Sequence, residues 1–378
     1  MQPTRRRGLV AVGMVAAVVL SACASGDKDP TGTMPAPASA KAPSSSFPVP
    51  AAGPTHEPLR GEPQIVVDGL DAPWSIVFRG ATALVSERDS GRILELGADG
   101  GTREIGVVPG VVHGGEGGLL GLALEGKRRL YAYSTGEEGN RIQRFELAGK
   151  PGSLSLGKAT ALLDGIPAGP NHNGGRLAFG PDGMLYATTG DGGQGAHAQD
   201  LDSLGGKILR LAPDGKVPQD NPFPGSYVYS YGHRNPQGLA WAEDGTMYAS
   251  EFGQNTWDEL NIITAGANYG WPRVEGVAGQ DDFTDPVQQW DPGEASPSGM
   301  ALVDGTIFLA NLRGASLRTI PLADTSASTE HYVGEFGRLR DAVIAPDGDL
   351  WFLTNNTDGR GSPGPDDDMI YSVDLAER

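Results

Sequence analysis

Cysteine is almost absent from this sequence: a single residue, Cys23, occurs among 378. One cysteine allows no disulfide within the chain and no cysteine-based zinc site. Basic residues are also scarce, because 29 Lys and Arg stand against 47 Asp and Glu, for a formal net charge of −18. Nucleic acid needs a basic face for its phosphates, so this charge balance argues against a nucleic-acid partner.

Glycine, in contrast, is abundant. It accounts for 57 of 378 residues, about 15% and twice the average usage of about 7%. This excess favours many tight turns over long helices. The glycines follow no three-residue period, which excludes collagen. Apolar residues make up 38% of the chain, enough to bury a core, which argues against global disorder.

Residues 1–22 have the pattern of an export signal. Three arginines at positions 5–7 precede an apolar run over residues 9–20, which is shorter than the ~20 residues of a membrane span. The run ends in LSAC (20–23), which resembles the lipobox of bacterial lipoproteins, where the cysteine is acylated and becomes the mature N-terminus. We expect a lipoprotein signal peptide over 1–22 and lipidation of Cys23. An ordinary signal peptide with a chance cysteine is the alternative.

Residues 23–60 have the composition of a linker. After Cys23 they are rich in Pro, Ala, Ser and Gly, as in APASAKAPSSSFPVPAAGP, which indicates a semi-extended tether. Two or more acyl chains would hold the protein stably on a membrane. We expect an exported protein, anchored by lipid to the outer face of the cytoplasmic membrane and touching the membrane only there. After removal of residues 1–22 the chain would contain 26 basic and 47 acidic residues, which gives a net charge of −21.

One pattern recurs from residue 61 onward: a turn ending in Asp-Gly or a similar pair, then an alternating run with a large apolar residue. PDGMLYATTGD (181–191) and PDGDLWFLTN (346–355) are examples. Asp-Gly supplies the positive-φ positions of a tight hairpin turn, and the following residues have strand propensity. The large residues of the six copies, at a mean spacing of 53 positions, are Val85, Tyr131, Tyr186, Tyr248, Phe308 and Trp351.

Six turn-rich copies at intervals of ~40–60 residues fit propeller blades of four strands each. A β-sandwich would show turns every 8–12 residues or so without this longer register. We therefore predict an all-β fold, a six-bladed β-propeller of four-stranded antiparallel blades that fills residues 61–378 as one domain.

Four polar clusters lie in the expected loops. In the first, NHNGGR (171–176), His172 stands beside two glycines whose backbone a ligand can approach, and imidazole is the usual general base near neutral pH. A solvated loop histidine is the alternative. The second, YSYGHRNPQG (229–238), combines a cation, two amides and aromatic rings, a set that is costly to bury without a ligand.

The third cluster, SEFGQNTWDELN (250–261) with GANYGWP (266–272), mixes carboxylates with flexible backbone, which suits a hard cation such as calcium. Acidic surface loops are the alternative. In the fourth, GRLRD (337–341), two arginines at i and i+2 point the same way in an extended chain and could hold carboxylates or phosphates. With Arg234 and Arg313 they form a cationic set that favours a small polyanion, with ordinary salt bridges as the alternative.

These segments closely resemble the glucose/sorbosone dehydrogenase family, from about residue 64 to residue 375. The family comprises soluble quinoproteins that use pyrroloquinoline quinone (PQQ) and calcium, including bacterial aldose sugar dehydrogenases. Its six-bladed propeller, with the cofactor at one end of the central axis, agrees with the six repeats counted independently. The resemblance lies in EGGLLGLAL (116–124), NHNGGRLAFGPDGMLYATTGD (171–191), GGKILRLAPDG (205–215), YSYGHRNPQGLAW (229–241) and DELNIITAGANYGWP (258–272).

The resemblance implies a role for each matching residue. His172 would take the proton from the sugar's anomeric hydroxyl while hydride passes to a quinone carbonyl carbon, and Asp191 would orient that histidine and raise its basicity. Arg234 and Asn235 match the pair that contacts the quinone oxygens, where positive charge stabilises the developing anion. The residues around the cofactor carboxylates would be Arg313, Arg338 and Arg340.

Calcium is implied by the same resemblance. The main-chain carbonyls of Gly253 and Gln254 stand at the positions that bind a cofactor-bridging calcium, which acts as a Lewis acid on the quinone. Asp258 would order this loop. Glu259 and Tyr269 resemble a second, structural calcium site.

Two positions depart from the family pattern. Phe252-Gly253-Gln254 stands where His-Gly-Pro is common, which should change loop stiffness more than ligand chemistry. Glu116 replaces a frequent glutamine near the cofactor, and we expect its added negative charge to lower affinity for an anionic ligand.

The sequence thus predicts a surface-anchored, monomeric aldose dehydrogenase that uses PQQ and calcium, oxidises the anomeric carbon to a lactone and passes electrons to an external acceptor. A propeller that keeps the fold but acts as a binding or scaffold module is the alternative. A lactonase-like hydrolase is a third possibility, and it would need carboxylates at the axis rather than arginines.

Overall fold

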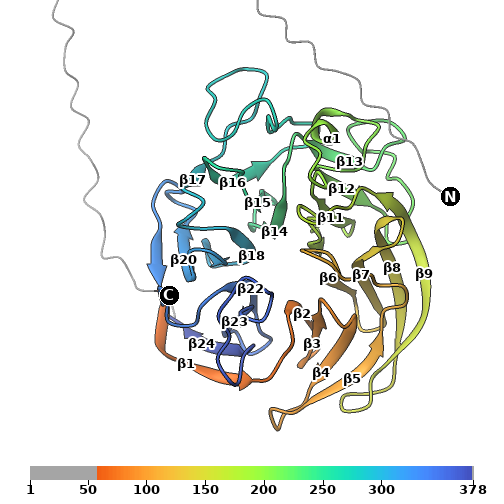
Figure 1. Cartoon of the computed structure of the whole chain (residues 1–378), viewed down its shortest axis with the longest axis vertical. Helices are drawn as coiled ribbons and strands as arrows, with labels where there is room; N and C mark the ends of the chain where they lie inside the picture. Colours follow the sequence, from red (N-terminus) through yellow and green to blue (C-terminus); the bar gives the residue numbers. More distant parts are fainter. Residues whose placement is uncertain (1–57, 377–378) are drawn as a thin grey trace, which may run out of the picture. The chain divides into compact units, whose positions relative to one another are not determined.

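Six four-stranded antiparallel sheets are arranged as blades around a common centre (Figure 1). The computed structural model describes residues 58–376. Cys23, the expected signal peptide and nearly all of the expected tether lie outside these residues. Within them, no helix is long and apolar enough to cross a membrane. The fold is a six-bladed β-propeller, as predicted from the repeats.

The blades follow one another along the chain. Blade 1 contains β2 (Pro73–Arg79), β3 (Thr82–Glu87), β4 (Arg92–Leu96) and β5 (Thr102–Val107), and blade 2 contains β6 (Leu119–Glu125), β7 (Arg129–Gly136), β8 (Gly139–Ala148) and β9 (Ser155–Ile166). Blade 3 contains β10 (Leu177–Phe179), β11 (Leu185–Thr189), β12 (Lys207–Leu211) and β13 (Val228–Tyr231), with the short helix α1 (Ala196–Gln199) between β11 and β12.

The second half repeats the order. Blade 4 contains β14 (Pro236–Trp241), β15 (Met247–Glu251), β16 (Asp258–Ile263) and β17 (Gln288–Trp290), and blade 5 contains β18 (Pro297–Val303), β19 (Thr306–Asn311), β20 (Ser316–Pro321) and β21 (Thr329–His331). Blade 6 contains β22 (Leu339–Ile344), β23 (Leu350–Thr354) and β24 (Ile370–Leu375), and its fourth strand is β1 (Leu59–Val67).

The ring is closed by strands from opposite ends of the described chain. β1 pairs antiparallel with β24, with Leu59 opposite Leu375 and Ile65 opposite Tyr371. β1 is therefore the outermost strand of blade 6 (Figure 1). It begins at Leu59, two residues before the expected start of the propeller at 61. Pairing β1 with β24 completes the four-stranded sheet of blade 6 from both ends of the described chain and covers the edge of β24.

Each of the six repeat residues lies on the second strand of its blade, from Val85 on β3 to Trp351 on β23. The Asp-Gly pairs therefore form the turns between first and second strands. Gly183 and Gly348 in two of these turns have φ angles of 74° and 100°, which glycine adopts without the strain of a side chain. The repeated turn-and-strand sequence therefore corresponds to a hairpin that occurs once in each blade.

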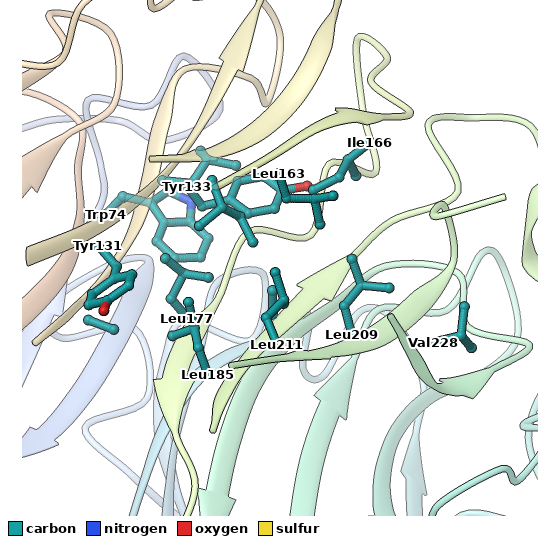
Figure 2. Close-up of a cluster of buried hydrophobic side chains, with 14 residues drawn as sticks. Trp74, Tyr131, Tyr133, Leu163, Ile166, Leu177, Leu185, Leu209, Leu211 and Val228 are labelled. Atoms are coloured by element: carbon teal, nitrogen blue, oxygen red, sulfur yellow. The ribbon is translucent and has the colours of Figure 1, made fainter. Parts of the chain in front are cut away.

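Apolar side chains between neighbouring blades hold the ring together. Figure 2 shows one such cluster, in which Trp74 of β2, Tyr133 of β7 and Leu185 of β11 come from three successive blades. All three side chains are buried. Burial of each large apolar side chain contributes about 1.5–3 kcal/mol, so each blade is stabilised by its neighbours.

The antiparallel pairing places two kinds of loop at the same end of the ring. Pro236, at the start of β14, is opposite Glu251, at the end of β15. Likewise Leu339, at the start of β22, is opposite Thr354, at the end of β23. Residues that precede the first strand of a blade therefore lie near residues that follow its second strand. Parts of all four polar clusters occupy these positions, whereas the GANYGWP segment (266–272) lies in the connection between β16 and β17.

Candidate active site

His172 and Asp191, which the resemblance pairs as base and orienting carboxylate, lie within hydrogen-bond distance of each other at blade 3. His172 precedes β10 and Asp191 follows β11, and His172 Nδ1 lies 2.7 Å from Asp191 Oδ1. The Asp191 side chain is 2% exposed. A carboxylate can only accept, so Nδ1 carries the proton, and Nε2 of the neutral ring carries the lone pair. This arrangement can accept a proton at Nε2.

Two further donors fix the Asp191 carboxylate. The backbone N–H of Gly193 donates to Oδ1 at 2.7 Å, and the indole Nε1 of Trp271 donates to Oδ2 at 2.8 Å. Burial raises the pKa of Asp191, but the hydrogen bonds from His172, Trp271 and Gly193 outweigh it and hold the pKa below its usual value. The carboxylate that orients the base therefore stays ionised at neutral pH.

The backbone of His172 is held as firmly as its side chain. Its φ of 57° is left-handed, a conformation uncommon outside glycine. Its N–H donates to Glu116 Oε2 at 2.8 Å, and its carbonyl accepts from the N–H of Gly192 at 3.0 Å. A Cβ on Gly190 would lie 1.9 Å from that carbonyl oxygen, so only glycine fits beside the base.

Arg234 and Asn235 precede β14 and are held by one buried carboxylate. Glu251, at the end of β15, accepts the backbone N–H of Arg234 and that of Asn235, and its other oxygen lies 2.8 Å from His233 Nδ1. Asn235 Oδ1 accepts from Gly174 N–H at 2.9 Å. The two predicted cofactor contacts are thus oriented by the fold.

Each of these residues keeps one unused donor. Arg234 Nε and Asn235 Nδ2 are buried and have no hydrogen-bond partner among the described residues. A buried donor left unsatisfied costs about 1–3 kcal/mol. The Arg234 guanidinium lies over the Trp271 ring at 5.5 Å and donates to the Phe252 carbonyl. A ligand with oxygen acceptors would satisfy both free donors.

Side chains from five of the six blades enclose a polar pocket, which we call the axial pocket because such residues can meet only at the centre of the ring. Four of the lining residues are arginines, and two are carboxylates. The lining residues are Trp74, Arg88, Glu116, Gln237, Phe252, Leu312, Arg338, Arg340, Asp358 and Arg360. The excess of positive charge suits an anionic ligand.

Arg338 and Arg340, which the resemblance places around the cofactor carboxylates, both line the axial pocket. Arg338 Nη2 lies 2.9 Å from Asp358 Oδ2, and Arg340 Nη2 lies 3.7 Å from the same oxygen. Arg340 also donates to Gln237 Oε1 at 2.7 Å. Burial lowers the pKa of Arg340, although the charge of Asp358 opposes this. Arg313 differs from the expectation: it is exposed and lines a neighbouring groove rather than the axial pocket.

The loop expected to hold calcium wraps around a carboxylate. Glu275 Oε1 accepts backbone N–H groups from residues 254–257, the first from Gln254 at 2.6 Å. Asp258 accepts from Gly253 N–H at 2.8 Å and from Ser296 N–H at 2.6 Å, and these hydrogen bonds connect this loop to the segment before β18. Burial raises the pKa of Asp258 to about 6.

Glu259 and Tyr269 line one small pocket together with Glu251 and Glu275. Glu259 is buried, and burial together with the charge of Glu251 raises its pKa to about 8. The Tyr269 hydroxyl donates to the Ile262 carbonyl at 2.6 Å, so its contribution to a cation would come from its backbone carbonyl. Across residues 58–376, no cluster of three or more His, Cys, Asp or Glu side chains is arranged to hold a metal ion.

Comparison with known proteins identifies the family. The profile of the Glucose / Sorbosone dehydrogenase family matches residues 70–362. The chain belongs to the glucose/sorbosone dehydrogenase family. The structure of the PQQ-bound aldose sugar dehydrogenase of Streptomyces coelicolor is 48% identical with a TM-score of 0.80, covering 84% of this chain and 99% of that one.

Two curated relatives extend the comparison. The aldose sugar dehydrogenase YliI of Escherichia coli K12 is 31% identical, over 78% of this chain and 90% of its own length. The quinoprotein glucose dehydrogenase B of Acinetobacter calcoaceticus is 34% identical over 56% of this chain, and the match spans 52% of that relative's length.

Within this glucose/sorbosone dehydrogenase chain, sequence reasoning missed several residues of the site. Arg88 directly follows β3, as Phe252 follows β15 and Leu312 follows β19, so an alignment of the repeats would have placed it at the axial pocket. Trp271 lies in the GANYGWP segment (266–272), but neither its position nor the family resemblance indicated a role for it. Arg360 carried no recognisable signal.

Glu116, one of the departures from the family pattern, is not an isolated charge. Its Oε1 accepts from Arg360 Nη1 at 2.6 Å, while Oε2 holds the backbone of His172. The expected loss of affinity for an anionic ligand assumed that no cation neutralises the Glu116 carboxylate. The ion pair with Arg360 provides the compensation.

Proposed function

We propose that this protein is a PQQ- and calcium-dependent aldose dehydrogenase that oxidises the anomeric carbon of a sugar to a lactone and passes the electrons to an external acceptor. The proposal depends on two features that meet at one end of the propeller. One is the His172–Asp191 pair, in which the carboxylate orients the imidazole, and the other is the pair of unused hydrogen-bond donors on Arg234 and Asn235. Support comes from the PQQ-bound relative at 48% identity.

The donor chemistry of the residues present fits PQQ, a planar tricarboxylate that also bears quinone oxygens. Arg234 Nε and Asn235 Nδ2 offer donors for the quinone oxygens, and the guanidinium groups of the axial pocket offer forks for the carboxylates. Trp74 lies at the edge of the same pocket and packs against the guanidinium groups of Arg176 and Arg340, which helps to fix Arg340 there. When bound, PQQ would supply the two-electron acceptor that the side chains of the protein lack.

His172 would act as the general base. Its Nε2 takes the proton from the anomeric hydroxyl, and the hydrogen on the same carbon departs with its electron pair, so that the alcohol carbon becomes the carbonyl carbon of the lactone. Asp191 keeps the imidazole in the required tautomer and stabilises the imidazolium that forms. The positive charge of Arg234 would stabilise negative charge that develops on the bound acceptor.

Calcium belongs to the proposal at two places. The carbonyls of Gly253 and Gln254 are proposed as ligands beside the cofactor, and Glu259 with the Tyr269 carbonyl as a second site. The raised pKa of Glu259 supports this, because a buried carboxylate close to Glu251 is unfavourable without a compensating cation.

The proposal also includes export and lipid anchoring through Cys23. A Cys23→Ser variant should be recovered outside the membrane fraction, whereas the unaltered protein should sediment with membranes and partition into detergent. Retention of the variant on membranes would contradict an anchor at this position.

The decisive test uses the apo-protein, PQQ and calcium. Calorimetric titration should show PQQ binding at micromolar affinity or tighter, dependent on calcium, and aldoses should then support reduction of a dye. His172→Ala should lose at least ~100-fold in rate while still binding PQQ. PQQ binding without turnover of any aldose would favour the scaffold alternative. A hydrolase receives no support, because both carboxylates of the axial pocket are paired with arginines.

A further inference from the structure

A chain of polar contacts connects the mouth of the axial pocket to the proposed base. Arg360, in the loop between β23 and β24, donates to Glu116 Oε1 at 2.6 Å, and Glu116 Oε2 accepts the backbone N–H of His172 at 2.8 Å. Arg360 belongs to blade 6, Glu116 precedes blade 2 and His172 precedes blade 3. Glu116 thus joins three loops that are far apart in the sequence.

Arg360 is the most accessible of the four arginines that line this pocket. Its side chain is 55% exposed, against 15% for Arg338 and 7% for Arg340 and Arg88. The buried arginines are already engaged: Arg338 and Arg340 lie near Asp358, and Arg88 contacts Asp89. Arg360 is therefore the arginine that an anion entering from solvent can reach with the least displacement of protein groups.

A guanidinium can serve two carboxylates at once. It presents five N–H donors in a planar fork, and in the structure Nη1 of Arg360 contacts Glu116. A second edge can face a ligand. Without Arg360, the Glu116 carboxylate would face an incoming anion without compensation and repel it.

We propose that Arg360 binds a carboxylate of the ligand at the mouth of the axial pocket, and that Glu116 couples this contact to the backbone position of His172. The inference rests on the proposed function in taking the ligand to be PQQ. It assigns Arg360 as a binding residue and Glu116 as a positioning residue.

Substitutions at Glu116 separate its two contacts. In Glu116→Gln the amide oxygen can still accept the His172 N–H, while the negative charge facing the pocket is removed. In Glu116→Ala both contacts are lost, and the left-handed backbone at His172 loses one of the hydrogen bonds that hold it. A structural role alone would make the two variants differ in stability only.

The experiment measures binding by titration calorimetry with two probes, PQQ and a planar pyridine tricarboxylate that lacks the quinone. Arg360→Gln should weaken both by at least about tenfold. Adding Glu116→Gln to Arg360→Gln should recover only part of that loss, because the repelling charge is gone while the contact from Arg360 to the ligand is still missing; full recovery would mean that Arg360 only neutralises Glu116 and would overturn its role as a binding residue. Arg128→Gln, an 84% exposed arginine between β6 and β7 at the opposite end of the ring, should bind as the unaltered protein does.

Turnover at saturating PQQ provides the second measurement. Glu116→Ala should lower kcat at least about tenfold more than Glu116→Gln does, because only alanine frees the backbone of His172. Equal kcat in the two variants would overturn the coupling. Unchanged binding of both probes by Arg360→Gln would overturn the role of Arg360.

These outcomes are distinct from failure of the proposed function. If the unaltered protein binds the tricarboxylate but shows no preference for PQQ and reduces no dye, the proposed enzymatic function is wrong. The effect of Arg360→Gln on tricarboxylate binding still decides whether Arg360 binds a ligand carboxylate. If the unaltered protein binds neither probe, both proposals are wrong.

Discussion

Replacing Trp271 by phenylalanine isolates one hydrogen bond of the His172–Asp191 pair. The substitution keeps an aromatic ring under Arg234 but removes the indole N–H that lies 2.8 Å from Asp191 Oδ2. Asp191 is buried, so solvent cannot replace the lost donor. A hydrogen bond to a charged group contributes about 1.5–3 kcal/mol, and we expect the free energy of unfolding at neutral pH to fall by about that amount.

The pH dependence gives this prediction its sign. The pKa of Asp191 is lower in the folded protein than its usual value. The ionised carboxylate therefore stabilises the fold above the pKa of an unfolded aspartate, about 3.9. This stabilisation is lost as the pH falls through the pKa that Asp191 has in the folded protein. The destabilisation by Trp271→Phe should therefore be largest near pH 7 and shrink below about pH 4. The same substitution should also raise the pKa of Asp191.

A matched control is available in blade 6. The indole Nε1 of Trp351 is buried without a partner among the described residues, so Trp351→Phe removes similar surface but no hydrogen bond. Urea unfolding of both variants and the unaltered protein, followed between pH 7 and about pH 3.5, separates the two effects. Equal losses for the two variants, or a loss for Trp271→Phe that does not change with pH, would refute the reasoning.

Three further predictions address other parts of the site. Gly190→Ala should destabilise the protein by at least about 3 kcal/mol in urea unfolding, because its Cβ would overlap the His172 carbonyl; a smaller loss would mean that the loop can move. Lys207→Met should cost a similar amount, because the buried ammonium donates to three backbone carbonyls that would lose their partner; unchanged stability would show that these carbonyls find other donors. Millimolar calcium should raise the melting temperature of the apo-protein, and Glu259→Gln should reduce that rise; an equal rise in both would place the ion elsewhere.

The fold could be predicted from the sequence because one local signal repeats. An Asp-Gly turn followed by a strand occurs once per blade, and Val85, Tyr248 and Trp351 all lie on second strands. The closing strand β1 could not be predicted in this way. Its burial alternates poorly, with most of Leu59–Val67 exposed or half-buried, and its partner lies about 300 residues away, beyond the reach of any local pattern.

In the candidate site, too, residues whose position follows from strand pairing could be predicted, and residues placed by long loops could not. His172 precedes β10, Asp191 follows β11 and Arg340 is the second residue of β22, and the pairing of those strands brings all three to one end of the ring. Trp271 reaches Asp191 through the long connection between β16 and β17, and Arg360 reaches Glu116 through the loop between β23 and β24. The paths of such loops depend on tertiary contacts rather than on turn chemistry, so these two residues became apparent only in the structure.

The pairing of β1 with β24 also fixes an order of events during biosynthesis. Of the described strands, β1 leaves the ribosome first and β24 last, yet each is the other's neighbour. Until residues 370–375 have been synthesised, β1 has no partner and blade 6 has an open edge that invites pairing with other chains. Nascent chains that stop short of β24 should therefore be targets for chaperones and proteases, although their first five blades are complete in sequence.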